Sequence, residues 1–144
     1  MPLLDEALTF LLANTTGFRN PVTASTDIPI YLNTMPTTPD TAMALYEPGG
    51  APPLVSLNST VPVSERPRLQ LMSRAPGYEA ARDNAQSIWD ALFGLTNTDI
   101  AKTGSTGVTT WQSADPVGSP GDLGLDGNNR NLVSANFQLT KEMS

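Results

Sequence analysis

The chain of 144 residues contains neither cysteine nor histidine. The absence of cysteine excludes disulfide bonds, thiolate metal sites and cysteine nucleophiles. The absence of histidine removes the side chain that most often serves as a general base and as a metal ligand. An enzyme of this composition would have to depend on carboxylates alone.

Positive charge is also scarce, since eight Lys and Arg residues stand against 14 Asp and Glu residues, for a net charge of −6. The eight are scattered along the chain, so the sequence offers no basic patch for gripping nucleic acid. The N-terminus carries acids where a signal peptide needs positive charge, and no apolar run approaches the ~20 residues of a membrane-spanning helix. We therefore expect a protein that is kept in a cytoplasm and has no membrane partner.

Hydrophobic residues make up 39% of the chain, below the usual apolar fraction of ~45–50%, so part of the chain is expected to lie unpacked in a free monomer. Gly and Pro are abundant, with 11 and 13 residues, and they predict that loops take a large share of the length. The length suits one domain, which we expect to span residues 1–144.

Two segments have the periodicity of amphipathic helices. The first spans residues 3–13, behind a proline that suits a first turn, and the second spans residues 78–93, with Gly94 positioned to end it. We expect their recurring apolar residues to face the core: Leu4, Ala7, Leu8, Leu11 and Leu12 in the first helix, and Tyr78, Ala81, Ala85, Ile88, Trp89 and Leu92 in the second.

Five segments read as strands, namely residues 28–33, 42–47, 68–74, 108–113 and 132–140. In three of them the side chains alternate with the period of two that is typical of a strand, and the last comes closest to the ideal pattern of a half-buried antiparallel strand. The first two are candidates for pairing with each other. The order of elements predicts an α+β domain, with a mainly antiparallel β-sheet of about four to five strands flanked by two helices and with long interconnecting loops.

The stretch from Pro48 to Pro67 is polar and weakly patterned, and we expect it to be a long loop. Loops above ~12–15 residues are uncommon in compact domains and are usually functional. Its apolar residues are too irregularly spaced to define a strand face, so we expect a neighbouring subunit to cover them. The predicted interface residues are Leu54, Val55, Leu57, Val61, Val63 and Trp111. Trp111 is included because aromatic side chains are enriched at contacts between subunits.

Residues 114–130 hold the one cluster that resembles a cation site, formed by Asp115, Asp122, Asp126 and Asn128. The cluster lacks the ligand spacing and the terminal Glu of a calcium-binding loop. Turn formation is its preferred role, because Asp-Gly and Asn tolerate positive φ. Arg130 is expected to form an ion pair with one of these acids. No glycine-rich stretch is followed by the Lys-Ser or Lys-Thr of a phosphate-binding loop, so the sequence predicts no catalytic residue, metal or cofactor.

Several phrases of the sequence stand in a recognisable order. They are Pro36-Thr-Thr-Pro-Asp40 running into Ala44-Leu-Tyr-Glu-Pro-Gly-Gly50, Arg68-Leu-Gln-Leu-Met-Ser-Arg74, the helical run from Tyr78 to Leu92, and Leu123-Gly-Leu-Asp126 leading to Ala135-Asn136-Phe137. From residue 28 onward, their order and spacing resemble the tail terminator, or tail completion, proteins of long-tailed bacteriophages, which are sometimes described as minor capsid proteins.

The resemblance implies a small α+β subunit that closes into a homo-hexameric ring at the head–tail junction, or neck, of the virion. In that family the ring caps the tail tube and meets the head completion or adaptor protein, and DNA passes through the lumen without specific binding. The resemblance also implies that the chain is made in the host bacterial cytoplasm and is not an enzyme. Two alternatives from the same particle are a head-tail adaptor and a tail tube subunit, and one from another class is a small carboxylate-dependent enzyme.

Overall fold

The computed structural model describes residues 2–23, 25–55, 62–101 and 108–142. This part of the chain forms two helices and ten strands. In chain order they are α1 (Pro2–Asn14), β1 (Phe18–Arg19), β2 (Ile28–Leu32), β3 (Ala42–Tyr46), β4 (Ala51–Val55), β5 (Pro62–Arg66), β6 (Arg68–Ala75), α2 (Tyr78–Leu92), β7 (Thr96–Ala101), β8 (Val108–Pro116), β9 (Gly121–Leu125) and β10 (Asn131–Glu142).

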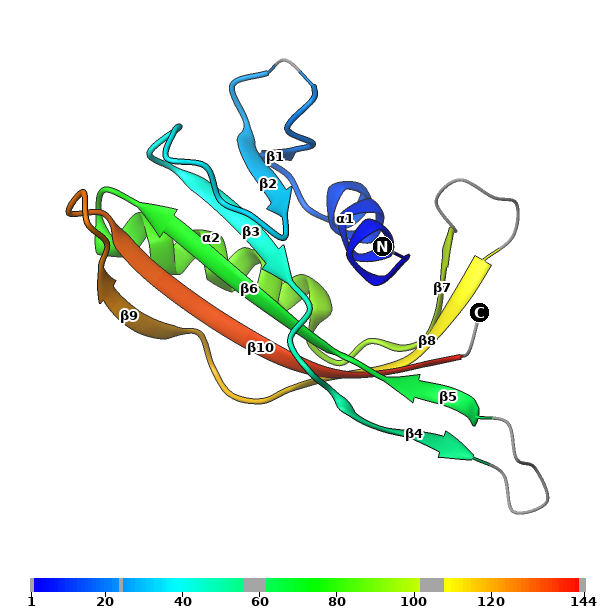
Figure 1. The fold of residues 1–144 in the computed structure, drawn as a ribbon. Coiled ribbons are helices and arrows are strands. Elements are labelled where there is room, and N and C mark those ends of the chain that lie inside the picture. The colour runs from blue at the N-terminus through cyan, green and yellow to red at the C-terminus, as the bar shows by residue number, and fades with distance from the viewer. Residues whose placement is uncertain (1, 24, 56–61, 102–107, 143–144) are drawn as a thin grey trace.

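The strands build one curled sheet around β10 (Figure 1). Seven of them follow the hydrogen-bonded path β1-β2-β3-β6-β10-β5-β4, while β8 and β9 pair with β10 and β7 pairs with β8. The pairs are antiparallel except for β1 with β2 and β2 with β3, which are parallel. The predicted pairing of the two segments that became β2 and β3 is therefore confirmed, but the expected α+β sheet of four to five strands is wrong, because the protein is mostly β.

The stretch from Pro48 to Pro67 contains strands that the sequence pattern did not predict. β4 and β5 pair antiparallel as a hairpin that projects from one end of the sheet (Figure 1). β4 carries two prolines and pairs with β5 alone among the described strands, as expected for an edge strand whose prolines cannot donate hydrogen bonds. The expected long loop is thus wrong over residues 51–55 and 62–66, which is half of its length.

Both predicted helices are confirmed, and their buried residues join one hydrophobic cluster with the inner face of the sheet. α1 lies between β2 and β7 (Figure 1) and buries Leu3, Leu4, Leu8 and Leu11 there, while Leu12 is only partly buried. α2 buries Ala81, Ala85, Ile88 and Leu92, and its end is followed by Gly94 at φ 75°. Tyr78 is exposed, and Trp89 is only half-buried on the flank of α2, so these two aromatics lie outside the core proper.

The alternation predicted for the last strand is confirmed in β10. Val133, Ala135, Phe137 and Leu139 are buried beneath the helices, while the residues between them are half-buried. Those intervening residues lie on the opposite face of the sheet, where the neighbouring strand β6 contributes residues such as Gln70. The domain therefore has two different sides, a helical layer and a largely polar sheet face.

Candidate functional site

A charged cluster lies inside the core, where α1 meets the end of β10. The Nζ of Lys141 is 2.9 Å from the Oε1 of Glu6, and the Nε1 of Trp111 donates a hydrogen bond to that same oxygen at 3.1 Å. The Oε1 of Glu65, on β5, is 3.3 Å from the Nζ of Lys141. These contacts join the N-terminal helix to three strands.

This cluster is built for structure and not for catalysis. The side chains of Lys141 and Glu6 are 1% and 3% exposed, so no substrate can reach them. The Nζ of Lys141 and the Nε1 of Trp111 both face Oε1 of Glu6, which compensates part of the cost of removing two charges from water. The arrangement therefore fastens α1 to the sheet.

The Asp-rich segment forms a turn that is closed by an ion pair, as predicted. Oδ1 of Asp126 accepts hydrogen bonds from the backbone N–H groups of Asn128 and Arg130, and Oδ2 lies 2.9 Å from the Nε of Arg130. The hydrogen bond from the backbone N–H of Arg130 is the main reason why the pKa of Asp126 lies below its ordinary value. The carboxylate is thus committed to the turn.

Two buried arginines fix the connection between β2 and β3. The guanidinium of Arg130 donates to the carbonyl of Thr37 and lies 3.3 Å from Oδ1 of Asp40. Arg74 donates to the carbonyls of Pro39 and Asp40. Burial lowers the pKa of Arg74, and the nearby positive charge of Arg130 adds to the effect. These contacts stabilise the connection between the parallel strands β2 and β3, which contains no helix.

The remaining acids of the predicted turn segment are also engaged locally. Asp122 accepts the backbone N–H of Gly124 at 2.8 Å, and the exposed Asp115 is within 3.4 Å of the hydroxyl of Ser113. Among the residues that the structure describes, no group of three or more acids could hold a metal ion. The segment serves as a turn and an edge strand.

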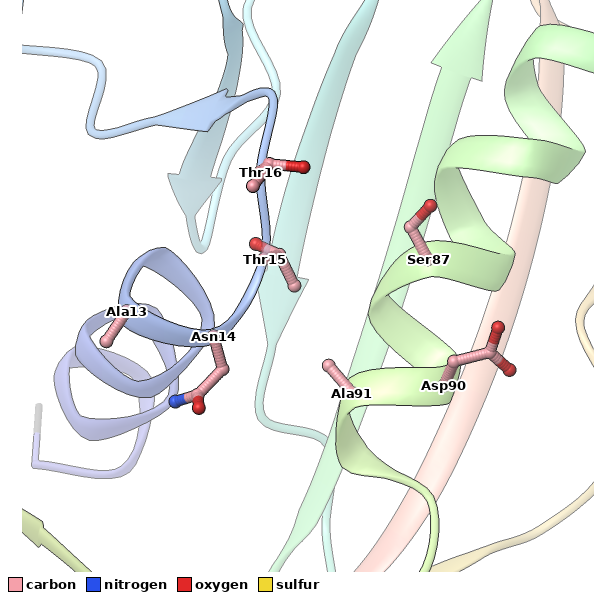
Figure 2. A pocket seen from close by; sticks show the side chains of 7 residues that line it. All are labelled: Ala13, Asn14, Thr15, Thr16, Ser87, Asp90 and Ala91. Atoms are coloured by element: carbon pink, nitrogen blue, oxygen red, sulfur yellow. The ribbon is translucent and has the colours of Figure 1, made fainter.

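A cleft of about 710 Å³ separates the C-terminal end of α1 from α2 (Figure 2). Three of its hydroxyl and amide groups donate to backbone carbonyls four residues earlier: Asn14 to that of Phe10, Thr15 to that of Leu11, and Ser87 to that of Asp83. The carboxylate of Asp90 is its one charged group. The cleft is lined by Ala13, Asn14, Thr15, Thr16, Ser87, Asp90 and Ala91. Nothing in it resembles a nucleophile paired with a base.

The predicted interface residues are distributed over two places in the fold. Leu54 and Val55 belong to β4 and Val63 to β5, so these three lie on the projecting hairpin, whereas Leu57 and Val61 lie outside the described residues. Trp111 is fully buried and bonded to Glu6 within the chain. Its side chain therefore has no surface to offer another subunit.

An exposed apolar edge was missed by the sequence reasoning. Val117, Leu123 and Leu125, on and before β9, are 53–60% exposed, and so is Phe93 at the end of α2. Phe93 stacks on Trp89 with the ring centroids 4.8 Å apart, and Trp89 donates to the carbonyl of Gly118. The apolar residues Leu123 and Leu125, two positions apart, could have indicated this edge strand, but the glycines and aspartates around them obscured the pattern.

Neither of the two described helices has the length and apolar character that crossing a membrane requires. No curated protein sequence matches the chain. A solved chain whose name states no activity superposes with a TM-score of 0.50 at 17% identity, over 82% of each chain, and this likeness supports the fold alone. A family model described as bacteriophage tail terminator protein matches residues 14–143, nearly the whole chain. The protein therefore belongs to the family of bacteriophage tail terminator proteins, which are structural components of the phage tail.

Proposed function

We propose that the chain forms a closed homo-hexameric ring at the head–tail junction, where it caps the tail tube and joins it to the head completion or adaptor protein. The observation that carries this proposal is the family match over residues 14–143. A closed ring needs each subunit to present two different, mutually complementary surfaces. The two unlike sides of this domain are suited to such a contact.

The acidic character of the chain supports a lumen that DNA crosses without being held. Of the eight Lys and Arg residues, Arg74, Arg130 and Lys141 are buried. Affinity for duplex DNA comes mainly from Lys and Arg that neutralise phosphates. A chain with a net charge of −6, three of whose cations are buried, repels the duplex and so favours its passage.

The β4–β5 hairpin is the contact that we propose for one ring neighbour. β5 pairs with β10 at only two positions, Glu65 with Lys141 and Ser64 with Glu142, and β4 is an edge strand (Figure 1). Leu54, Val55 and Val63 supply the apolar residues of this hairpin. A projecting edge of this kind is a ready surface for another chain.

Replacing residues 52–63 by a two-residue Asn-Gly turn tests this contact, because none of the core residues that the structure describes lies in this segment. The helix content should be kept and the melting temperature should fall only slightly, while ring formation should weaken. Substituting Asn-Gly for Ser25-Thr26, in an exposed loop, is the matched control. If the shortened chain assembles as well as the parent, the hairpin is not an intersubunit contact.

The ring itself is tested by light scattering and electron microscopy of the purified chain, with and without tail tubes. We expect a species of six subunits, in solution or on tube ends, and no growth beyond a single ring. Long polymers formed by the chain alone would instead indicate a tail tube subunit. Binding to head connectors without binding to tubes would indicate a head-tail adaptor.

A further inference from the structure

Most of the basic residues are engaged within the chain. Seven of the eight have described side chains, and six of these donate hydrogen bonds to groups of their own chain. Arg19 donates to three backbone carbonyls, Arg82 to Gln86 and Arg68 to Gln138, while the other three are the buried residues Arg74, Arg130 and Lys141.

Arg66 and Arg68 lie together where β5 passes into β6. Arg68 is exposed, with its Nε 3.3 Å from Oε1 of Gln138, and Arg66 has no side-chain partner in the described part of the chain. Leu69 points into the core beneath the helices, so Arg68 points to the opposite face of the sheet. Glu65 likewise points inward to Lys141, which places Arg66 on that same outer face. We call this pair the sheet-face arginines.

The helical layer carries the opposite charge. Glu79, Asp83 and Asp90 are all exposed on α2. At about 100° per residue, they fall within ~40° of one another on the side opposite the buried residues Ala81 and Ile88. We call these three the helix-face acids.

The neighbouring helix end adds to this negative character. Asp90 lines the cleft beside the C-terminal end of α1 (Figure 2), and neither helix has a basic residue in its last turn. The carbonyl groups at a helix C-terminus carry partial negative charge. The helical side of the domain is therefore electronegative over both α2 and the end of α1.

We propose that the sheet-face arginines of one subunit pair with the helix-face acids of the next, so that this contact repeats around the ring. This inference rests on the proposed function. The two groups lie on different layers of the same domain, as a head-to-tail contact requires. Complementary charges also select the partner and its orientation, since any contact between two helical faces would bring acids together.

A second copy fits these arginines better than DNA does. Two arginines on a chain of net charge −6 neutralise few phosphates, and the slope of affinity with salt follows the number of phosphates neutralised. Every copy of the chain, in contrast, brings three exposed carboxylates on one helix.

Two charge-reversal variants test the pairing. Variant A is Asp83→Arg with Asp90→Arg, and variant B is Arg66→Glu with Arg68→Glu. Both alter solvent-accessible side chains, and basic residues near the end of α2 suit its dipole, so circular dichroism should show parent-like folds. Each variant alone should associate at least about tenfold more weakly than the parent. Asp27→Arg, in an exposed loop, is the control for a charge reversal away from the proposed contact.

Mixing the two variants provides the decisive measurement, by light scattering and native mass spectrometry. In an alternating ring every A–B contact joins opposite charges, so the 1:1 mixture should assemble although neither variant does so alone. Failure of the mixture to assemble would overturn the pairing, as would parent-like assembly of either variant. Loss of retention on duplex DNA by variant B, with its assembly intact, would assign the arginines to phosphate and also overturn it. A parent chain that never assembles, even on tail tubes, would overturn the proposed ring itself.

Discussion

Replacing Lys141 by Met should destabilise the domain far more than the loss of one ion pair on the surface would. The Nζ of Lys141 lies 2.9 Å from the carboxylate of Glu6, which is itself almost fully buried. Met fills much of the same space but cannot compensate the charge of Glu6. The remaining hydrogen bond from Trp111 is a weak substitute for a cation.

The expected magnitude follows from what the substitution leaves behind. Removing one partner of a buried pair costs about 3–5 kcal/mol, because an uncompensated charge stays inside the protein. Small domains are stable by only about 5–15 kcal/mol. At roughly 2–4 °C per kcal/mol for a chain near this size, the melting temperature should fall by about 6–20 °C.

The double variant Glu6→Gln with Lys141→Met separates the charge effect from the packing effect. Gln keeps an oxygen for the indole N–H of Trp111 and brings no charge into the core, so the double variant should be more stable than K141M alone by about 1–3 kcal/mol. Urea denaturation followed by tryptophan fluorescence measures both variants. If K141M unfolds at the same urea concentration as the parent, or if the double variant is no more stable than K141M, the reasoning about a buried charge is refuted.

Two further predictions concern the core and the turn. Ile88→Ala should cost roughly 2–5 kcal/mol in thermal or urea unfolding, because the side chain is fully buried, whereas Ser87→Ala on the exposed side should change little. Asp126 has a lowered pKa in the folded state, so its carboxylate stabilises the fold above the ordinary pKa of 3.8, and this stabilisation is lost as the pH falls through the folded value. Asp126→Asn should therefore melt below the parent at pH 7, and the two melting temperatures should converge as the pH falls through the folded pKa of Asp126. A difference that is unchanged by pH would contradict the assignment.

The elements that the sequence predicted well are those whose burial is periodic. α2 and β10 each bury a regular set of side chains against one layer, so their hydrophobic patterns follow their geometry. β4, β7 and β9 were missed because they lie toward the margins of the sheet and owe their conformation to pairing with a neighbour rather than to an apolar face. Such pairing is a property of the whole fold, and a local pattern does not record it.

Among the polar contacts, the one between residues close in sequence was predicted, and the one between distant residues was not. The Asp126–Arg130 pair spans one turn and was predicted from the local sequence. The contact of Glu6 with Lys141 joins positions 135 residues apart, which spacing alone could not reveal. The sequence did contain one indication of this contact. Every second residue of β10 from Val133 to Leu139 points inward, and the next residue in that series is Lys141. An inward lysine implies a buried acid, although its identity depends on how α1 docks.

The use of cations inside the chain has a consequence for assembly. Arg74, Arg130 and Lys141 are buried and stabilise the fold, so the outer surface is mostly acidic. Two copies of the chain therefore repel each other in most relative orientations. The proposed orientation, which brings Arg66 and Arg68 to the acids of α2, relieves this repulsion. Exposed ion pairs contribute little binding energy, so in this arrangement charge selects the orientation, while apolar contacts such as those proposed for the hairpin supply the strength. A ring built this way should tolerate the loss of single charges but not their reversal.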